Sequence, residues 1–230
     1  MGKESIWHLK NFNIFKGMSD SDMKSIETMV KTDHIRRSDP VYLQGEPTRW
    51  IYFLKEGLIK LSFVTEDGKT ATLALMEPGE IFGELDLNDK AESQTEAVAL
   101  EDCYLCRLSR ESFLEMVRSR QDMMFTVNKL MGLRMRRVES AIRDLLFLDV
   151  PARVAKLLFN LSESNGQSVP AGVRIGLRLT HQEIGYLVGA TREMVTTVLG
   201  RFEHEGLLIQ DRRRLVLPHP ERLMTYFTNR

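Results

Sequence analysis

Residues 179–199 read LTHQEIGYLVGATREMVTTVL, and this stretch decides the fold of the C-terminal third of the chain. Thr180 and Glu183 have the spacing of a capping box, which predicts that a helix begins directly after Thr180. Gly189 can adopt the left-handed conformation that ends such a helix and turns the chain. Thr191 is placed to cap a second helix. This spacing is typical of a helix-turn-helix.

The two helices are expected to bury one face each. Ile184 and Leu187 of the first helix point inward, and Gly185 is small enough to let the second helix cross closely. The second helix has apolar residues at i, i+3, i+4 and i+7, which are Val195, Val198, Leu199 and Phe202. The opposite face exposes four polar residues, which are Arg192, Glu193, Thr196 and Thr197.

These four exposed residues are candidates for reading DNA bases, because a recognition helix presents such positions to the major groove. Arginine can donate two hydrogen bonds to guanine, and glutamate can accept one from the cytosine amino group. A solvated helical hairpin with an Arg–Glu pair would tolerate the same residues. The segment that follows favours DNA binding. Apolar runs at 207–209 and 215–217 flank Asp211 and three arginines, which predicts a strand-turn-strand wing.

The wing arginines Arg212, Arg213 and Arg214 are expected to contact DNA phosphates. We also expect Thr180 and Thr191 to contact phosphates. The whole chain of 230 residues is neutral, yet from residue 150 onward 11 Lys and Arg stand against 7 Asp and Glu. This net charge of +4 in the C-terminal third fits a DNA-binding module joined to a domain of another kind.

The preceding part of the chain has a different character. Residues 1–31 read as short helices, and residues 33–108 alternate turn signals with short β-prone runs. Short strands at this spacing predict an antiparallel barrel or sandwich. Cys103 and Cys106 have CxxC spacing, but in a strand they point to opposite faces. The sequence offers no second Cys/His pair to complete a zinc site, so we interpret both as buried structural residues.

A long helix is expected from about residue 122 to 147. Apolar residues recur along it in steps of three and four, and they are Met124, Val127, Met131, Met135, Val138, Ile142 and Leu145. The helix could instead lie across its own domain, but the stripe is narrow and suits a two-helix seam better. We therefore expect a homodimer. The expected domains are 1–121 for the sensor, 122–148 for the dimerisation helix and hinge, and 149–230 for the winged helix-turn-helix.

Three motifs together carry a family resemblance: Phe82-Gly83-Glu84-Leu85, Phe147-Leu148-Asp149-Val150, and residues 180–185 with 191–193. In this order and spacing, nearly the whole chain resembles the CRP/FNR family of bacterial transcription regulators. The resemblance implies a cyclic-nucleotide-binding-type β jelly roll, a dimerising helix and a winged helix-turn-helix, an α+β fold. It also implies that Arg192 and Glu193 read bases. The family's third reader is an arginine, and Thr197 stands there, so we expect a different half-site.

The effector pocket departs from the pattern of the cAMP-binding members. Their Arg-Ser pair, which holds the cyclic phosphate, aligns with Ser93 and Gln94. Their Thr-Ser pair on the long helix aligns with Val138 and Glu139. Between Leu85 and Asp102 the single cation is Lys90. The pocket expected from this alignment comprises Gly83, Glu84, Leu85, Ser93, Gln94, Val138 and Glu139, and its ligand is expected to differ from cAMP.

The sequence thus predicts a regulator that binds double-stranded DNA at an inverted repeat, with RNA polymerase as a further partner and an unknown small-molecule effector. One alternative is a regulator with a vestigial pocket, and another is a cyclic-nucleotide-binding protein without DNA activity. No nucleophile–base set, metal cluster or phosphate-binding glycine loop stands out, so we expect no catalytic site, metal or cofactor. Without a signal peptide or an apolar run of membrane-spanning length, a cytoplasmic protein is expected.

Overall fold

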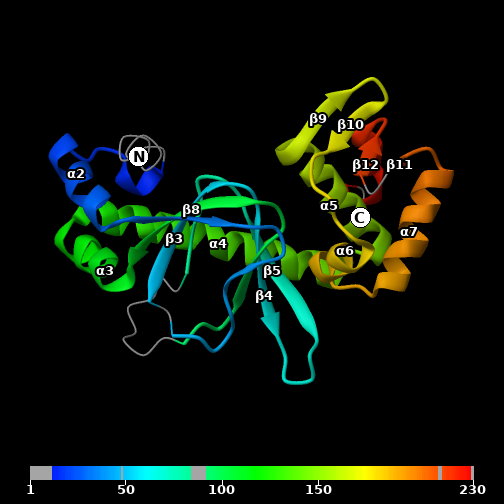
Figure 1. The fold of residues 1–230 in the computed structure, drawn as a ribbon. Coiled ribbons are helices and arrows are strands. Elements are labelled where there is room, and N and C mark those ends of the chain that lie inside the picture. The colour runs from blue at the N-terminus through cyan, green and yellow to red at the C-terminus, as the bar shows by residue number, and fades with distance from the viewer. Residues whose placement is uncertain (1–11, 48, 84–91, 212–213, 229–230) are drawn as a thin grey trace. The chain divides into compact units, whose positions relative to one another are not determined.

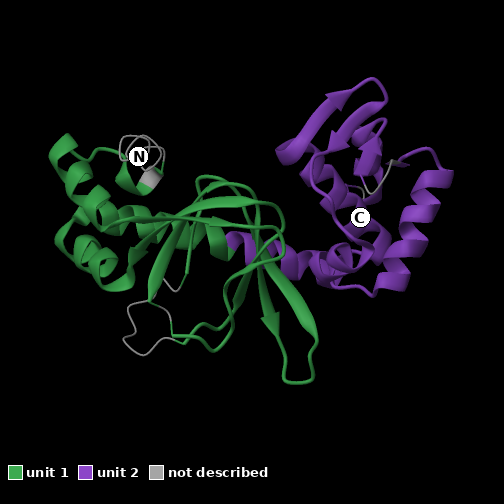
Figure 2. Ribbon diagram, in the orientation of Figure 1, with its two compact units in different colours: residues 1–135 green, residues 136–230 purple. Residues whose placement is uncertain are grey.

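A computed structural model describes residues 12–47, 49–83, 92–211 and 214–228. The chain divides into two compact units, residues 1–135 and residues 136–230, and the boundary falls inside the long helix α4 (Gln121–Phe147) (Figure 2). Over the described part of the chain, no helix is both long and apolar enough to cross a bilayer.

Two four-stranded antiparallel sheets form the β-roll of the first unit (Figure 1). The strand orders are β1-β8-β3-β6 and β2-β7-β4-β5. The strands are β1 (Lys31–Ile35), β2 (Pro40–Tyr42), β3 (Trp50–Glu56), β4 (Ile59–Val64), β5 (Thr70–Met76), β6 (Ile81–Phe82), β7 (Glu96–Ala99) and β8 (Cys103–Ser109). The predicted antiparallel β domain followed by a long helix and a helix-turn-helix is confirmed.

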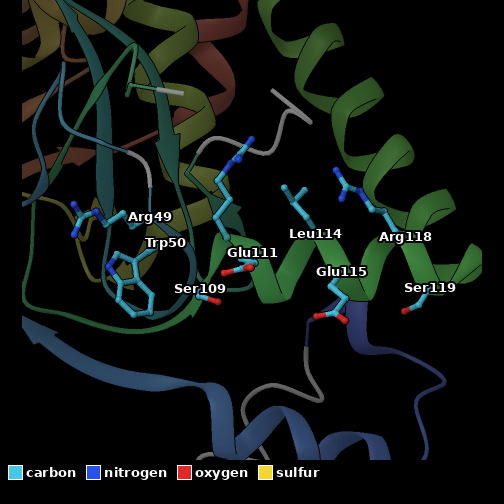
Figure 3. A pocket seen from close by; sticks show the side chains of 9 residues that line it. Arg49, Trp50, Ser109, Glu111, Leu114, Glu115, Arg118 and Ser119 are labelled. Atoms are coloured by element: carbon cyan, nitrogen blue, oxygen red, sulfur yellow. The ribbon is translucent and has the colours of Figure 1, made fainter. Parts of the chain in front are cut away.

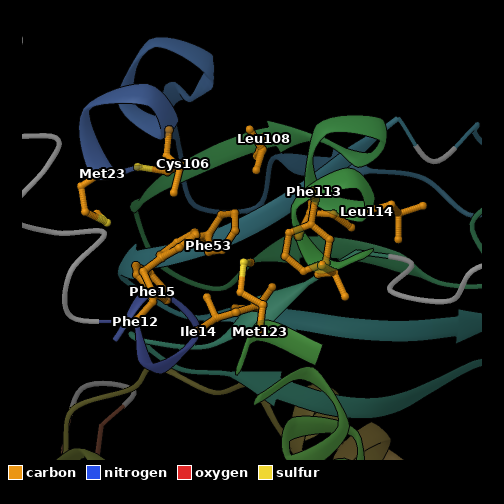
Figure 4. Packing of buried hydrophobic residues seen from close by; sticks show 14 residues of the cluster. Phe12, Ile14, Phe15, Met23, Phe53, Cys106, Leu108, Phe113, Leu114 and Met123 are labelled. Carbon is orange, nitrogen blue, oxygen red and sulfur yellow. The ribbon is translucent and has the colours of Figure 1, made fainter. Parts of the chain in front are cut away.

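Helices cover the outer face of the first of these sheets. They are η1 (Asn13–Phe15), α2 (Asp20–Met29), α3 (Arg110–Ser119) and the first turns of α4. Phe53 of β3 is fully buried there, with ring centroids 5.4 Å from Phe12 and 5.2 Å from Phe15 (Figure 4). Ser19 and Ser109 cap α2 and α3, because the side chain of each serine accepts a hydrogen bond from the backbone of the first turn.

The two cysteines lie on opposite faces of β8, as predicted. Cys106 belongs to the core beneath the helices, whereas Cys103 belongs to the core between the two sheets. Both thiols are free and buried. Burial raises the pKa of Cys103 to about 11 and also raises the pKa of Cys106, so both are neutral, unreactive thiols near pH 7.

The second unit contains the helix-turn-helix and a small sheet of order β11-β12-β10-β9. Its elements after α4 are α5 (Val150–Asn165), β9 (Gly166–Val169), β10 (Gly172–Ile175), α6 (His181–Val188), α7 (Arg192–His204), β11 (Ile209–Asp211), β12 (Arg214–Leu217) and η2 (Pro220–Tyr226). Val195, Leu199 and Phe202 of α7 are fully buried in this unit.

The expected hinge between α4 and α5 is a tight turn held by hydrogen bonds. Asp149 caps α5, and its side chain accepts from the Ala152 N–H at 3.0 Å. Arg153 donates to three carbonyl oxygens, those of Leu148 (2.7 Å), Val188 (2.8 Å) and Gly189 (3.3 Å). One guanidinium therefore joins the end of α4 to the end of α6.

Candidate functional site

The helix-turn-helix forms as its sequence predicts. Thr180 Oγ1 accepts from the Glu183 N–H at 3.1 Å, and the Glu183 carboxylate accepts from the Thr180 N–H at 2.6 Å, which completes the capping box. Gly189 ends α6 with φ of +63°. A Cβ on Gly185 would lie 2.6 Å from the Ala190 carbonyl oxygen, so only glycine allows the observed close approach.

Helix α7 separates a buried back from an exposed polar front. Thr191 caps it by accepting from the Met194 N–H at 3.3 Å. The predicted apolar stripe is buried, and it comprises Val195, Val198, Leu199 and Phe202. The four candidate base readers all lie on the exposed front, and they are Arg192, Glu193, Thr196 and Thr197. The fold therefore brings the predicted readers together on one surface.

Hydrogen bonds within α7 and to its N-cap involve three of the four side chains on the polar front. Bonds from its own backbone N–H and from the Thr191 hydroxyl hold the pKa of Glu193 below its usual range, so its carboxylate is an ionised acceptor near neutral pH. The hydroxyls of Thr196 and Thr197 donate to the carbonyls of Arg192 (2.8 Å) and Glu193 (3.1 Å).

Two further residues of this surface were missed by the sequence reasoning. Met194 is 46% exposed at the start of α7, beside the readers. His181 Nδ1 of α6 lies 2.8 Å from Thr196 Oγ1. The periodicity around Met194 could have revealed its exposure, because it falls outside the buried stripe. Nothing local signals the His181 contact, which depends on how α6 and α7 cross.

The predicted wing is present as the antiparallel pair β11 and β12, in which Asp211 is the register partner of Arg214. Leu207 and Leu208, expected to begin the first strand, are buried just before it. Arg214 is half-buried at the start of β12. Arg212 and Arg213 lie outside the described residues, so their phosphate contacts stay a prediction.

The far end of α7 is tied to the C-terminal turn η2. Arg201 donates to Glu205 at 2.8 Å, and the Tyr226 hydroxyl donates to the same carboxylate at 2.5 Å. The Arg201 guanidinium holds the pKa of Glu205 below its usual range, with a further contribution from Tyr226. These contacts fix α7 at the end opposite to its reading residues.

Most of the predicted dimer stripe on α4 is exposed. The exposed members are Met124 (51%), Met135 (60%), Val138 (49%), Ile142 (52%) and Leu145 (52%). Met131 is half-buried, and Val127 packs partly against the core of its own unit. Four more apolar residues of α4 are exposed that the heptad pattern left out, namely Phe125, Leu133, Leu146 and Phe147.

The expected effector pocket is only partly assembled within the described residues. Gly83 and Ser93 line one small cavity of about 20 Å³, together with Tyr42, Tyr52 and Arg49 among others. Gln94 is exposed. Glu84, Leu85 and the cation Lys90 lie outside the described residues. Val138 and Glu139 are exposed on α4 in the second unit, so their part in a pocket stays a prediction.

Aromatic rings fill the space beside this cavity. Tyr52 stacks on Tyr42 at 5.6 Å and on Phe82 at 5.1 Å between ring centroids. Burial raises the pKa of Tyr52 to about 12. Ser93 is 2% exposed, and its hydroxyl donates to the Thr95 carbonyl at 2.6 Å. The volume of about 20 Å³ between these described residues accommodates about one water molecule.

Gly83 itself has a structural reason to be glycine. Its φ is +105°, and a Cβ there would lie 2.8 Å from the Trp50 carbonyl oxygen. A larger hollow of about 1040 Å³ lies between the start of β3 and α3, where Arg49, Leu114 and Arg118 are among its lining residues (Figure 3). Arg49, which is distant in sequence from Gly83 and Ser93, is a lining residue of both spaces.

Comparison with known proteins gives matches over both units. Residues 32–120 match the cyclic nucleotide-binding domain family, and residues 152–226 match the Crp-like helix-turn-helix domain family. A CRP-like cAMP-activated global transcriptional regulator of Mycobacterium tuberculosis is 28% identical over 215 residues, covering 94% of this chain and 96% of that protein. A global nitrogen regulator of Synechocystis is 29% identical over 194 residues, covering 84% and 86%.

Among solved structures, a CRP-family transcriptional regulator from Thermus thermophilus superposes with a TM-score of 0.75 at 27% identity. The match covers 86% of this chain and 97% of that one. Sequence and structure thus agree over both the β-roll and the helix-turn-helix, in the same order along the chain.

Proposed function

We propose that this chain, which belongs to the CRP/FNR family of transcription regulators, binds a specific inverted-repeat operator as a homodimer. The observation that carries the proposal is α7, whose buried back and capped N-terminus hold Arg192, Glu193, Thr196 and Thr197 on an exposed front. Arg192 would donate to guanine, and Glu193 would accept from a cytosine amino group. Arg214 and the neighbouring wing arginines would neutralise phosphates.

Selection of bound sequences from random DNA tests this proposal directly. A dimer should select two inverted half-sites whose centres are about one helical turn apart, roughly 34–36 Å. Recovery of a single unpaired half-site would contradict the dimer, and failure to enrich any sequence would contradict specific binding. A gel shift with the selected duplex also separates this function from a cyclic-nucleotide-binding protein without DNA activity.

The exposed stripe of α4 supports dimerisation, because five of its apolar side chains are about half exposed or more in the single chain. Val138→Asp would place two like charges on the seam, and an uncompensated buried charge costs about 3–5 kcal/mol. Sedimentation should therefore show a large loss of dimer. Glu139→Asp, one residue away, keeps the charge pattern and serves as the control. An unchanged dimer in Val138→Asp would place the interface elsewhere.

For the effector, we propose a ligand other than cAMP. A cyclic phosphate keeps one negative charge, and burying it without a cation or several donors is very costly. Ser93 stands where the cAMP-binding members have arginine, and its hydroxyl is already bonded to Thr95. Arg49 at the cavity rim could pair with a smaller anion. Isothermal titration should show no micromolar binding of cAMP, and a cAMP-dependent gain in operator binding would contradict the proposal.

A second candidate is regulation without any ligand. The stacked rings of Tyr42, Tyr52 and Phe82 and the cavity of about 20 Å³ favour it, since they leave little room beside Ser93. Purified protein would then bind its operator as tightly as protein mixed with small molecules extracted from cells. A gain on adding the extract favours an effector instead. In vitro transcription with purified RNA polymerase would test the proposed contact with that enzyme.

A further inference from the structure

We propose that His181 fixes the hydroxyl of Thr196 so that this side chain reads DNA only as a hydrogen-bond acceptor. The inference rests on the proposed function, because it concerns how α7 reads bases. It goes beyond that function by assigning a positioning residue on α6 and the chemical group that Thr196 recognises.

The hydrogen bonds around one oxygen atom carry the inference. Thr196 Oγ1 donates to the Arg192 carbonyl at 2.8 Å, and His181 Nδ1 lies 2.8 Å from the same oxygen. A hydroxyl has a single proton, so the ring nitrogen must be the donor in the second contact. The two bonds use the proton and one of the two lone pairs. One lone pair and the methyl group remain on the exposed front of α7.

This arrangement restricts which base edge suits Thr196. In the major groove, the exocyclic amino groups of adenine and cytosine are donors, whereas N7 and O6 of guanine are acceptors. A remaining lone pair can accept from an amino group but is repelled by N7 or O6. Swinging the proton toward the DNA would break the bond to the Arg192 carbonyl, while the His181 contact holds the oxygen in place. Thr196 therefore favours an amino group on the base that it contacts.

Single-atom changes in the DNA test this prediction. In the selected operator, each adenine of a half-site is replaced by purine, which lacks the amino group, and each cytosine by 2-pyrimidinone, which also lacks it. One such replacement should weaken binding of the natural protein roughly three- to tenfold, as expected for one hydrogen bond. Thr196→Val should lose this sensitivity. Thr197→Val is the matched control and should keep the sensitivity. The Thr197 hydroxyl also donates to a carbonyl of its own helix, that of Glu193, at 3.1 Å.

The opposite chemistry would overturn the proposal. If Thr196→Val removes sensitivity to 7-deazapurine instead, then Thr196 donates to N7. If it removes sensitivity only to loss of the thymine methyl, then Thr196 acts through its own methyl group. If no replacement distinguishes Thr196→Val from the natural protein, Thr196 reads nothing.

The role of His181 is tested by a pair of variants. His181→Asn retains an amide nitrogen that can donate from near the position of Nδ1, whereas His181→Phe retains a flat ring without a donor. The sensitivity to the amino group should persist in His181→Asn and disappear in His181→Phe, although thermal unfolding shows both folded. Equal sensitivity in both variants would remove His181 as a positioning residue.

Failure of the proposed function would look different. In that case the natural protein enriches no sequence, and Arg192→Ala changes nothing, which overturns both proposals together. If an operator is selected and depends on Arg192, but no amino group couples to Thr196, only this further inference is overturned.

Discussion

The reading head, residues 180–217, and the interior of the β-roll dispose their polar groups in opposite ways. The reading head turns Arg192, Glu193 and Thr196 outward and backs them with a buried apolar stripe. The roll interior encloses Tyr52 and Ser93, and its space is taken by stacked rings and by a hydroxyl bonded to the backbone. An outward polar surface can bind a partner without rearrangement. A filled interior must first give up internal contacts before it admits a ligand.

This difference predicts that removing side-chain atoms from the roll interior lowers the free energy of unfolding more than removing them from the exposed front of α7. Phe82→Ala should lower the free energy of unfolding by about 3–5 kcal/mol, because Phe82 is fully buried and stacked on Tyr52. Trp50 begins β3 and no tryptophan follows it in the sequence, so urea unfolding followed by tryptophan fluorescence reports on the first unit. Met194→Ala in the exposed front is the control. Because the second unit has no tryptophan, unfolding of this variant is followed by circular dichroism, and the change should stay within about 0.5 kcal/mol.

A small effect of Phe82→Ala would contradict the proposed difference between the two regions, since it would mean that the interior rearranges readily around a missing ring. A gain in ligand affinity in the same variant would support the difference further. That result would show that Phe82 occupies space which a ligand needs, and that the stability of the roll competes with binding.

The next largest effect is expected in DNA binding by the reading head. Arg192→Ala should weaken operator binding by about 1–3 kcal/mol and relax the preference at one base pair. Quantitative gel shifts on the operator and on its single-base variants measure both quantities. Arg222→Ala, which removes an exposed arginine of η2, controls for the loss of one positive charge. Equal weakening on every duplex would make Arg192 a phosphate contact.

The smallest effect on sequence preference is expected at the wing. Replacing Arg212, Arg213 and Arg214 by alanine should weaken binding to all duplexes alike, because phosphate contacts carry no sequence information. Each lost contact should make the slope of log K against log salt shallower by roughly 0.9. Titrations at several salt concentrations measure this slope. An unchanged slope would remove the wing from the interface.

The two regions also differ in how far the sequence predicts them. The capping box of Thr180 and Glu183, the left-handed Gly189 and the Thr191 cap are local signals, each contained within a few residues, and all are confirmed. The exposed front of α7 followed from the same spacing. The first wing strand was predicted slightly too early, because buried Leu207 and Leu208 resemble the start of a strand.

The roll interior depends on contacts between residues far apart in the chain. Nothing near Ser93 announces that Tyr42 and Tyr52 fill the adjacent space, or that Arg49 reaches the same cavity. The α4 stripe shows a similar limit. Its periodicity predicted an apolar seam, yet it could not reveal that Val127 packs partly against its own core. Periodicity identifies the face of a helix, whereas the partner of that face depends on tertiary structure.

The three bonds of Arg153 have a mechanical consequence. A guanidinium is flat and rigid, and here it holds the carbonyls of Leu148, Val188 and Gly189 at once. Lys156 adds a second tie, with its Nζ 2.7 Å from the Asp144 carboxylate. Hydrogen bonds and an ion pair through α5 therefore join the last turn of α4 to α6, the first helix of the reading head. A rotation of that end of α4 would therefore act on α6 through the hydrogen bonds of Arg153.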